Sequence, residues 1–401
     1  MTSTFEIGKS IITTLLNAGF ESYFTGGCVR DMVMNITPQD YDIATAADVS
    51  CIKKLFRKTV EVGASFGVIL VIEQGMPFQV AHFRGNSPLP EDDAHKRDFT
   101  INGLFYDYIK DQIIDYVHGR QDIGKKIIRA IDSPHNRFTE DPLRMLRAVR
   151  LATTLRFEIE NETLCTLTQM AHLITNVSIE RIRNELLLLC SSGNISYGLD
   201  LLIKTNLLEI LFPEYDPIAN NVRASIHALV HHTTIHHYFI GIPALLYSLS
   251  HELQQTISQE SSNLNIPLLK RLKLSADDST AIRTILGSHA RFIQALRVSI
   301  GQKKKWMQTI TFLWELEFHK LLLHTQNKPL TTYTHLKKMY DSLSYTDLFP
   351  QPLISGTDLI KQGFSPSPSW SELFKELEIR HLDGTLTSSK DAIDWAKTFL
   401  S

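Results

Sequence analysis

The sequence changes character near residue 142, and this change constrains the fold more than any other feature. Before it, short extended segments alternate with helical ones; after it, apolar residues recur three and four positions apart almost to the C-terminus. We therefore predict an α+β chain, in which a small mixed β-sheet flanked by helices is followed by an almost wholly helical remainder. The 401 residues are enough for two or more cores.

Two hairpins form the clearest part of the predicted sheet. Residues 68–83 read VILVIEQGMPFQVAHF, with the turn at Gln74-Gly75, and residues 104–117 read LFYDYIKDQIIDYV, with a turn near Lys110-Asp111. Three further elements are expected, namely a helix around residues 11–16, a strand at 21–25 and a helix around 49–56.

Composition and charge exclude several classes of protein. The chain has 43% hydrophobic and 21% charged residues, which is typical of globular domains. Its four cysteines are scattered and form no C-x-x-C pair, which argues against a disulfide framework and a zinc ribbon. No apolar run is long enough to cross a bilayer, and the N-terminus lacks the pattern of a secretory signal, so we expect a cytoplasmic protein without a membrane partner. The oligomeric state cannot be predicted from these features.

The formal net charge of −2 means that a polyanionic partner must be held by a local basic surface. Residues 120–156 offer one, with nine Lys and Arg residues against four acidic residues.

The stretch YFTGGCVRDMVMNITPQDYDIAT, residues 23–45, contains the first candidate site. Gly26 and Gly27 lie between a predicted strand and a short helix, where backbone N–H groups can approach a phosphate. Arg30 would face the same anion from one turn inside the helix. Asp40 and Asp42 are expected on a strand at period two, so that both carboxylates project from one face and suit Mg²⁺.

Taken separately, these features could be an ordinary turn and a solvated strand end. Taken in order, they predict nucleotidyl or phosphoryl transfer, in which metal ions neutralise a pyrophosphate group.

In these and later motifs the chain resembles the class II tRNA nucleotidyltransferases and bacterial poly(A) polymerases. GGCVRDMVMNITPQDYDIAT is similar to the first motif of that family. KRDFTINGLFYD, IIDYVHGRQDIGKKIIRAI, RFTEDPLRMLRAVRLA and SIERIRNELLLLC resemble the second to fifth motifs, in the same order, and residues 354–386 resemble the family's tail. The resemblance implies a nucleotidyltransferase-type head at residues 1–138, a helical neck at 139–210, and a helical body and tail at 211–401 that hold tRNA.

The resemblance also implies roles for individual residues. Asp40 and Asp42 would be catalytic and hold two Mg²⁺ ions, with CTP and possibly ATP as substrates. The triphosphate and ribose would be bound by Gly26, Gly27, Arg30, Arg97, Asp98 and Asn102. Asp141 and Arg144 would read the base, with further nucleotide or RNA contacts from Glu140, Arg147, Arg150 and Arg181.

Asp141 and Arg144 could distinguish bases, because a carboxylate only accepts hydrogen bonds and a guanidinium only donates them. Cytosine and adenine each present an exocyclic amine beside an accepting ring nitrogen, whereas uracil and guanine present the opposite polarity there. The alternative is structural: Asp141 before Pro142 could cap a helix, and Asp141 and Arg144 could form an i,i+3 ion pair on its surface.

Two departures from the family pattern bear on the activity. Gln79 replaces a glutamate that relatives often carry, which places a third carboxylate near the metals in doubt. Only eleven residues separate Arg84 from Lys96, whereas relatives that build a complete CCA usually have a longer flexible loop there. We therefore expect addition of CC. A complete CCA-adding enzyme, a poly(A) polymerase and a catalytically impaired RNA-binding relative remain as alternatives.

Three other signals are interpreted as structural or left open. Cys28 is expected to pack rather than react. The histidines His227, His231, His232, His236 and His237 could chelate a metal but are interpreted as residues of a helix face. Lys303 to Lys305 beside Trp306 could contact RNA or form a solvated charged turn.

Overall fold

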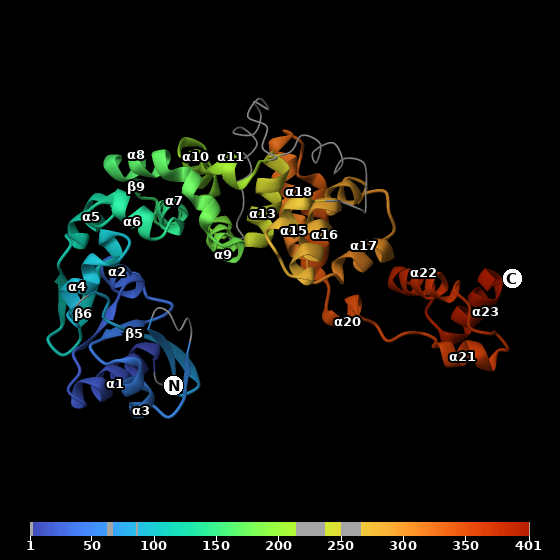
Figure 1. The fold of residues 1–401 in the computed structure, drawn as a ribbon. Helices are drawn as coiled ribbons and strands as arrows, with labels where there is room; N and C mark the ends of the chain where they lie inside the picture. The colour runs from blue at the N-terminus through green and yellow to red at the C-terminus, as the bar shows by residue number, and fades with distance from the viewer. Residues whose placement is uncertain (1–2, 62–66, 86, 214–236, 250–265, 401) are drawn as a thin grey trace. The chain divides into compact units, whose positions relative to one another are not determined.

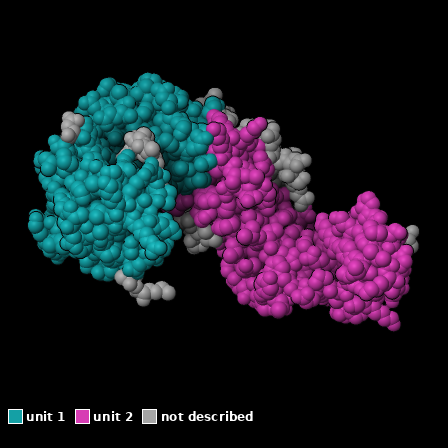
Figure 2. Space-filling model, turned by 60° about the horizontal axis from the view of Figure 1, so that its bottom comes forward, with its two compact units in different colours: residues 1–189, 197–213 teal, residues 190–196, 214–401 magenta. Residues whose placement is uncertain are grey.

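The computed structural model describes residues 3–61, 67–85, 87–213, 237–249 and 266–400. The chain forms two compact units, residues 1–189 with 197–213 and residues 190–196 with 214–401 (Figure 2). We refer to them as unit 1 and unit 2. Unit 1 ends near the predicted boundary at residue 210, and the division between head and neck at residue 138 stays a prediction.

Unit 1 contains a seven-stranded sheet with the order β3-β4-β5-β2-β1-β6-β7. Strands β2 and β5 pair in parallel and the other neighbours are antiparallel, so the predicted mixed sheet is confirmed. Both hairpins form at the predicted turns. The strands are β1 (Ser22–Thr25), β2 (Asp42–Thr45), β3 (Thr59–Glu61), β4 (Val68–Glu73), β5 (Met76–His82), β6 (Leu104–Asp107) and β7 (Gln112–Asp115).

Strand β1 is buried on both faces, which explains why its four residues carry no alternation of polar and apolar side chains. Phe24 stacks on Phe5 of helix α1 (Thr4–Asn17) on one face of the sheet. Tyr23 projects to the other face, where it packs against Phe83 and Phe105. Apolar side chains therefore pack on both faces of the sheet at β1.

Helices and short 3₁₀ turns complete unit 1 (Figure 1). They are α2 (Gly27–Val33), α3 (Val49–Leu55), α4 (Pro90–His95), η1 (Thr100–Asn102), α5 (Gly119–Lys125), α6 (Pro134–Glu140), α7 (Leu143–Leu155), α8 (Asn161–Met170), η2 (Ala171–Asn176), α9 (Ile179–Cys190), α10 (Ile195–Lys204) and α11 (Leu207–Leu211).

One element in this region departs from the prediction. Strand β9 (Glu158–Ile159) lies beyond residue 142 and pairs in parallel with β8 (Ile127–Ile128). Each strand of the pair has only two residues, too few to produce a periodic pattern, and therefore the pair was not predicted.

The described part of unit 2 is helical, as predicted. Its helices are α13 (Tyr238–Leu249), α15 (Pro267–Arg271), α16 (Ala276–Ile293), α17 (Ile300–Met307), α18 (Phe312–Thr325), α19 (Thr331–Ser342), α20 (Tyr345–Leu348), α21 (Gly356–Lys361), α22 (Trp370–Asp383) and α23 (Ser389–Leu400). No helix within the described ranges is long and apolar enough to cross a membrane.

The interpretation of Lys303 to Lys305 as a turn was wrong, whereas contact of these lysines with RNA stays a prediction. The segment is part of helix α17 and not a turn, and Trp306 is only 9% exposed, in a core with Phe292 and Phe312. Lys303 is buried and lies 3.3 Å from a ring nitrogen of His335. Trp306 is therefore not available to stack on a base.

Candidate active site

A cavity of about 780 Å³ in unit 1 brings the predicted site residues together. They come from segments far apart in the sequence: the turn before α2, the approach to β2, the loop before η1, and helices α6, α7 and α9. All the predicted residues line it, namely Gly26, Gly27, Arg30, Asp40, Asp42, Arg97, Asp98, Asn102, Glu140, Asp141, Arg144, Arg147, Arg150 and Arg181. Their chemical roles stay predictions.

Sequence reasoning left six lining residues out of the site. They are Val68, Gln79, Arg84, Lys96, Leu143 and Leu151. Arg84 and Lys96 carry positive charge. Lys96 is the first residue of the second motif, which was an available signal, whereas Arg84 lies outside the recognised motifs.

The diglycine bend lies where the sequence predicted, between a strand and a short helix. Gly26 follows β1 and precedes α2 with φ 77° and ψ −135°, a backbone region in which side chains are strained. A Cβ atom on Gly26 would lie 3.3 Å from Nη1 of Arg97 and 3.8 Å from Oδ2 of Asp42. Glycine therefore satisfies the bend and also leaves space beside two charged groups of the cavity.

The placement of Asp40 differs from the prediction. Strand β2 begins at Asp42, and Asp40 lies in a bend before it, because pairing with β1 extends only as far as Asp42. Both carboxylates nevertheless line one cavity. Burial, together with the neighbouring charge of Asp40, raises the pKa of Asp42 to about 6. Two carboxylates that repel each other in a partly buried place favour a bound cation.

Gln79 lies beside this pair. Strand β5 runs parallel to β2 with Ile43 opposite Val80, so that Gln79 extends the same register next to Asp42, and its side chain lines the cavity. Within the described ranges, no group of three or more His, Cys, Asp or Glu side chains could hold a metal ion. The carboxylates of Asp40 and Asp42 are two oxygen ligands of the kind that could hold Mg²⁺.

Arg30 is anchored by two side chains. Its Nη1 donates to Oδ1 of Asn102 at 3.0 Å, and its Nε and Nη2 donate to Oδ1 of Asp31 at 2.9 and 2.7 Å. The guanidinium group lies against Gly27, 3.6 Å from the position of a Cβ atom there. Arg30 and the bend are therefore adjacent, as predicted.

Asp98 connects this arginine network to helix α7. It accepts hydrogen bonds from the N–H of Phe99 at 2.8 Å and from Nδ2 of Asn102 at 3.2 Å, and it pairs with Arg147 at 2.9 Å. Burial alone would raise its pKa, but Arg147 and these donors hold the pKa of Asp98 below its usual value. Asp98 therefore stays ionised and fixes Arg147 at the cavity wall.

The two residues predicted to read the base do not pair with each other among the described contacts. Asp141 forms a bidentate ion pair with Arg181, with N–O distances of 2.7 and 3.2 Å. Arg144 donates a hydrogen bond to the carboxylate of Glu140 at 2.9 Å. Helix α7 begins at Leu143, whose N–H donates to Asp141 at 3.2 Å. The alternative of an i,i+3 ion pair was therefore wrong, and so was Asp141 as the N-cap, because the N-cap residue of α7 is Pro142.

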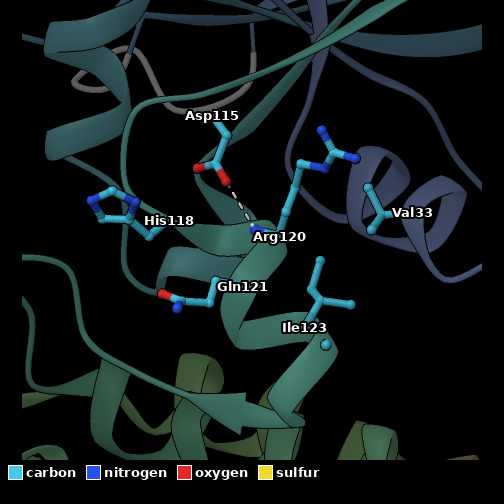
Figure 3. Close-up of a pocket in the computed structure, with 7 residues that line it drawn as sticks. Val33, Asp115, His118, Arg120, Gln121 and Ile123 are labelled. Atoms are coloured by element: carbon cyan, nitrogen blue, oxygen red, sulfur yellow. Dashed lines mark hydrogen bonds between the residues drawn. The ribbon is translucent and has the colours of Figure 1, made fainter.

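A second cavity of unit 1 has nearly the same volume, about 790 Å³. Figure 3 shows Asp115, His118, Arg120 and Gln121 around it, together with apolar side chains. The carboxylate of Asp115 accepts hydrogen bonds from the N–H groups at the start of α5, including that of Arg120 at 3.0 Å. These donors are already used within the protein, and none of the predicted catalytic residues lines this cavity.

Cys28 is buried, and His237 is the one histidine of the predicted group that lies among the described residues. Burial, followed by the charge of Asp42, raises the pKa of the Cys28 thiol to about 12, so Cys28 packs and does not react as a nucleophile. His237 stacks on Trp314 with ring centroids 5.2 Å apart. The remaining histidines of the predicted group, residues 227–236, lie outside the described residues.

Comparison with known protein families gives two matches. A model described as the poly A polymerase head domain matches residues 22–129, and one described as a probable RNA and SrmB-binding site of polymerase A matches residues 156–219. The CCA-adding enzyme of Limosilactobacillus reuteri is 29% identical over 406 residues, covering 96% of this chain and 94% of that enzyme. The resemblance to the class II tRNA nucleotidyltransferase and bacterial poly(A) polymerase family is therefore confirmed.

Another relative has a higher identity over a shorter stretch. The CCA-adding enzyme of Enterococcus faecalis is 37% identical over 215 residues, covering 50% of this chain and 53% of that enzyme. The prediction of a nucleotidyltransferase is confirmed by the family assignment.

Solved structures show the same fold. The crystal structure of the Bacillus stearothermophilus CCA-adding enzyme in complex with CTP has a TM-score of 0.70 and 23% sequence identity, covering 99% of this chain and 98% of that one. The Thermotoga maritima CCA-adding enzyme complexed with tRNA has a TM-score of 0.62 and 19% identity, covering 99% and 95%. The predicted α+β fold, a mixed sheet followed by helices, is thereby confirmed.

Proposed function

We propose that this nucleotidyltransferase adds cytidylate residues from CTP to the 3′ end of tRNA in the cavity lined by Asp40, Asp42 and Arg144. The supporting observation is that a carboxylate pair, a diglycine bend and several arginines from separate segments converge on one cavity. Relatives over nearly the full length are called CCA-adding enzymes, and similar structures were solved with CTP and with tRNA.

The residues divide the reaction into distinct tasks. Asp40 and Asp42 would hold Mg²⁺, which when bound supplies positive charge against the triphosphate. The Gly26-Gly27 bend, with Arg30 and Arg97, binds the phosphates by N–H and guanidinium groups. The 3′ oxygen of the RNA forms a bond to the α-phosphorus of CTP, the bond to the bridging oxygen breaks, and pyrophosphate leaves.

Selection of the base rests on hydrogen-bond polarity. Asp141 accepts from the exocyclic amine of cytosine, and Arg144 donates to its ring nitrogen. Arg181 and Glu140 hold these two side chains by ion pairs, which keeps them from pairing with each other. UTP would place an oxygen against the carboxylate and an N–H against the guanidinium, and unpaired buried groups are costly.

Addition of CC is favoured by the segment between Arg84 and Lys96, which has eleven residues and is fixed by hydrogen bonds from Ser87 and Arg84 to side chains of α4. Complete CCA addition is the second candidate, because the same polarity argument admits ATP and the relatives are CCA-adding enzymes.

One assay tests the proposal and separates the candidates. The purified protein is incubated with tRNA lacking CCA and with tRNA ending in CC, with CTP, ATP or both, and the 3′ ends are sequenced. Addition of two cytidylates alone supports the first candidate, and CCA supports the second. A long adenylate tail or the absence of any product would contradict the proposal.

A further inference from the structure

A buried carboxylate lies just outside the cavity, in helix α4. Asp93 is only 1% exposed, although aspartate is rarely fully buried unless it is paired. It belongs to the eleven-residue segment between Arg84 and Lys96. Its neighbours Glu91 and Asp92 are exposed and half-buried, respectively, so burial distinguishes Asp93 within an acidic stretch.

Asp93 contacts two arginines. Its Oδ2 accepts hydrogen bonds from Nη2 and Nε of Arg97 at 2.6 and 3.2 Å. Its Oδ1 accepts from the backbone N–H of Arg84 at 3.4 Å and lies 3.8 Å from Nε of the same residue. Both arginines line the cavity, whereas Asp93 is not among its described lining residues. Asp93 therefore contacts both arginines on the side away from the cavity.

The position that Asp93 gives to Arg97 matters for the phosphate site. The guanidinium of Arg97 lies over the ring of Phe105, 5.1 Å from its centroid, and its Nη1 approaches the Gly26 bend. The charges of Arg97 and Arg84 both lower the pKa of Asp42, against the larger effect of burial. Both arginines line the same cavity as the Gly26 bend, so one anion bound there can contact both.

We propose that Asp93 is a positioning residue for the triphosphate, acting through Arg84 and Arg97, and that Arg84 is a phosphate-binding residue. This inference rests on the proposed function. Arginine presents fixed N–H groups that match phosphate oxygens only when its plane is correctly oriented. A buried carboxylate with both oxygens engaged orients two such planes at once.

The test compares Asp93→Asn with Glu91→Gln, a change of the same charge at an exposed position of the same helix. Affinity for CTP and for CMP is measured by calorimetry in buffer with Mg²⁺, and kcat and KM are measured with tRNA. For Asp93→Asn we expect the Kd and KM for CTP to rise about 10- to 100-fold, with a smaller change for CMP and in kcat. Glu91→Gln should match the unaltered protein.

A second variant makes the test independent of folding. The side chain of Arg84 is half exposed, so Arg84→Gln should fold, and it too should weaken CTP more than CMP. The effects of Asp93→Asn and Arg84→Gln should also be less than additive when combined.

Unchanged CTP affinity in Asp93→Asn, equal losses for CTP and CMP, or normal CTP binding by Arg84→Gln would each overturn the inference. If the unaltered protein binds CTP but extends no tRNA, the proposed function is wrong. The Kd values of Asp93→Asn for CTP and CMP would still show whether Asp93 positions the arginines for the triphosphate.

Discussion

The two cavities of unit 1 have almost equal volumes, about 780 and 790 Å³, yet differ in the chemistry that they can support. The cavity at Asp115 and Arg120 is lined mainly by α5 and the loop before it, and its carboxylate serves the local backbone. The cavity at Asp42 collects charged side chains from several segments far apart in the sequence. Convergence of distant segments, rather than size, therefore identifies the candidate active site.

The largest effect is expected from Asp42→Asn. Losing one of the two carboxylates that hold the metal should cost several kcal/mol of transition-state stabilisation, or about a 10³-fold loss of kcat/KM for tRNA extension with CTP. The matched control is Asp111→Asn, at the exposed turn between β6 and β7 of the same sheet. Near-normal kcat/KM in Asp42→Asn would remove the metal assignment.

A smaller loss is expected from Gly26→Ala. The added methyl group would strain the backbone at the positive φ of Gly26 and push against Arg97. Because this displaces the phosphate contacts, we expect activity to fall about 10- to 100-fold. Gly75→Ala is the control, because Gly75 has φ 81° in a hairpin turn with nothing near its Cβ position. Both variants should lose about 1–3 kcal/mol of unfolding free energy, measured by urea denaturation. Equal activity in the two variants would contradict a phosphate site at the bend.

A change of selectivity is expected from Arg144→Ala. Loss of the donor that faces the ring nitrogen should lower the preference for CTP over UTP by at least about tenfold, measured as the ratio of kcat/KM values. Arg156→Ala, which alters an exposed arginine at the end of the same helix, should keep the preference. If Arg144→Ala discriminates normally, another residue reads the base.

The smallest effect is expected at the second cavity. Arg120→Gln removes the only arginine among its described lining residues, and kcat and KM for CTP should change less than about twofold, because surface substitutions away from a site are usually near neutral. A loss comparable to that of Gly26→Ala would mean that both cavities take part in nucleotide binding.

Much of the site could be predicted because its residues belong to contiguous motifs. The diglycine bend, Arg30 and the arginines of α7 follow from local sequence, and the fold then brings them together. Asp93 and Arg84 could not be predicted in this way, since nothing local separates Asp93 from Glu91 or Asp92. Only the packing of α4 near the end of β5 buries one carboxylate of that stretch and leaves its neighbours outside.

The same limit explains the errors of the sequence analysis. The register of β1 with β2 leaves Asp40 outside the strand, and tertiary packing buries Trp306 despite three adjacent lysines. Pattern and propensity describe what a segment can form, whereas burial depends on the partner that the fold supplies.

The central claim is best tested by a crystal structure with CTP and Mn²⁺, in which anomalous scattering locates the metal. We predict Mn²⁺ between Asp40 and Asp42, with the triphosphate on the Gly26-Gly27 bend and the base facing Asp141 and Arg144. Metal or nucleotide bound instead in the cavity at Asp115 and Arg120, or away from Asp42, would contradict the assignment of the active site.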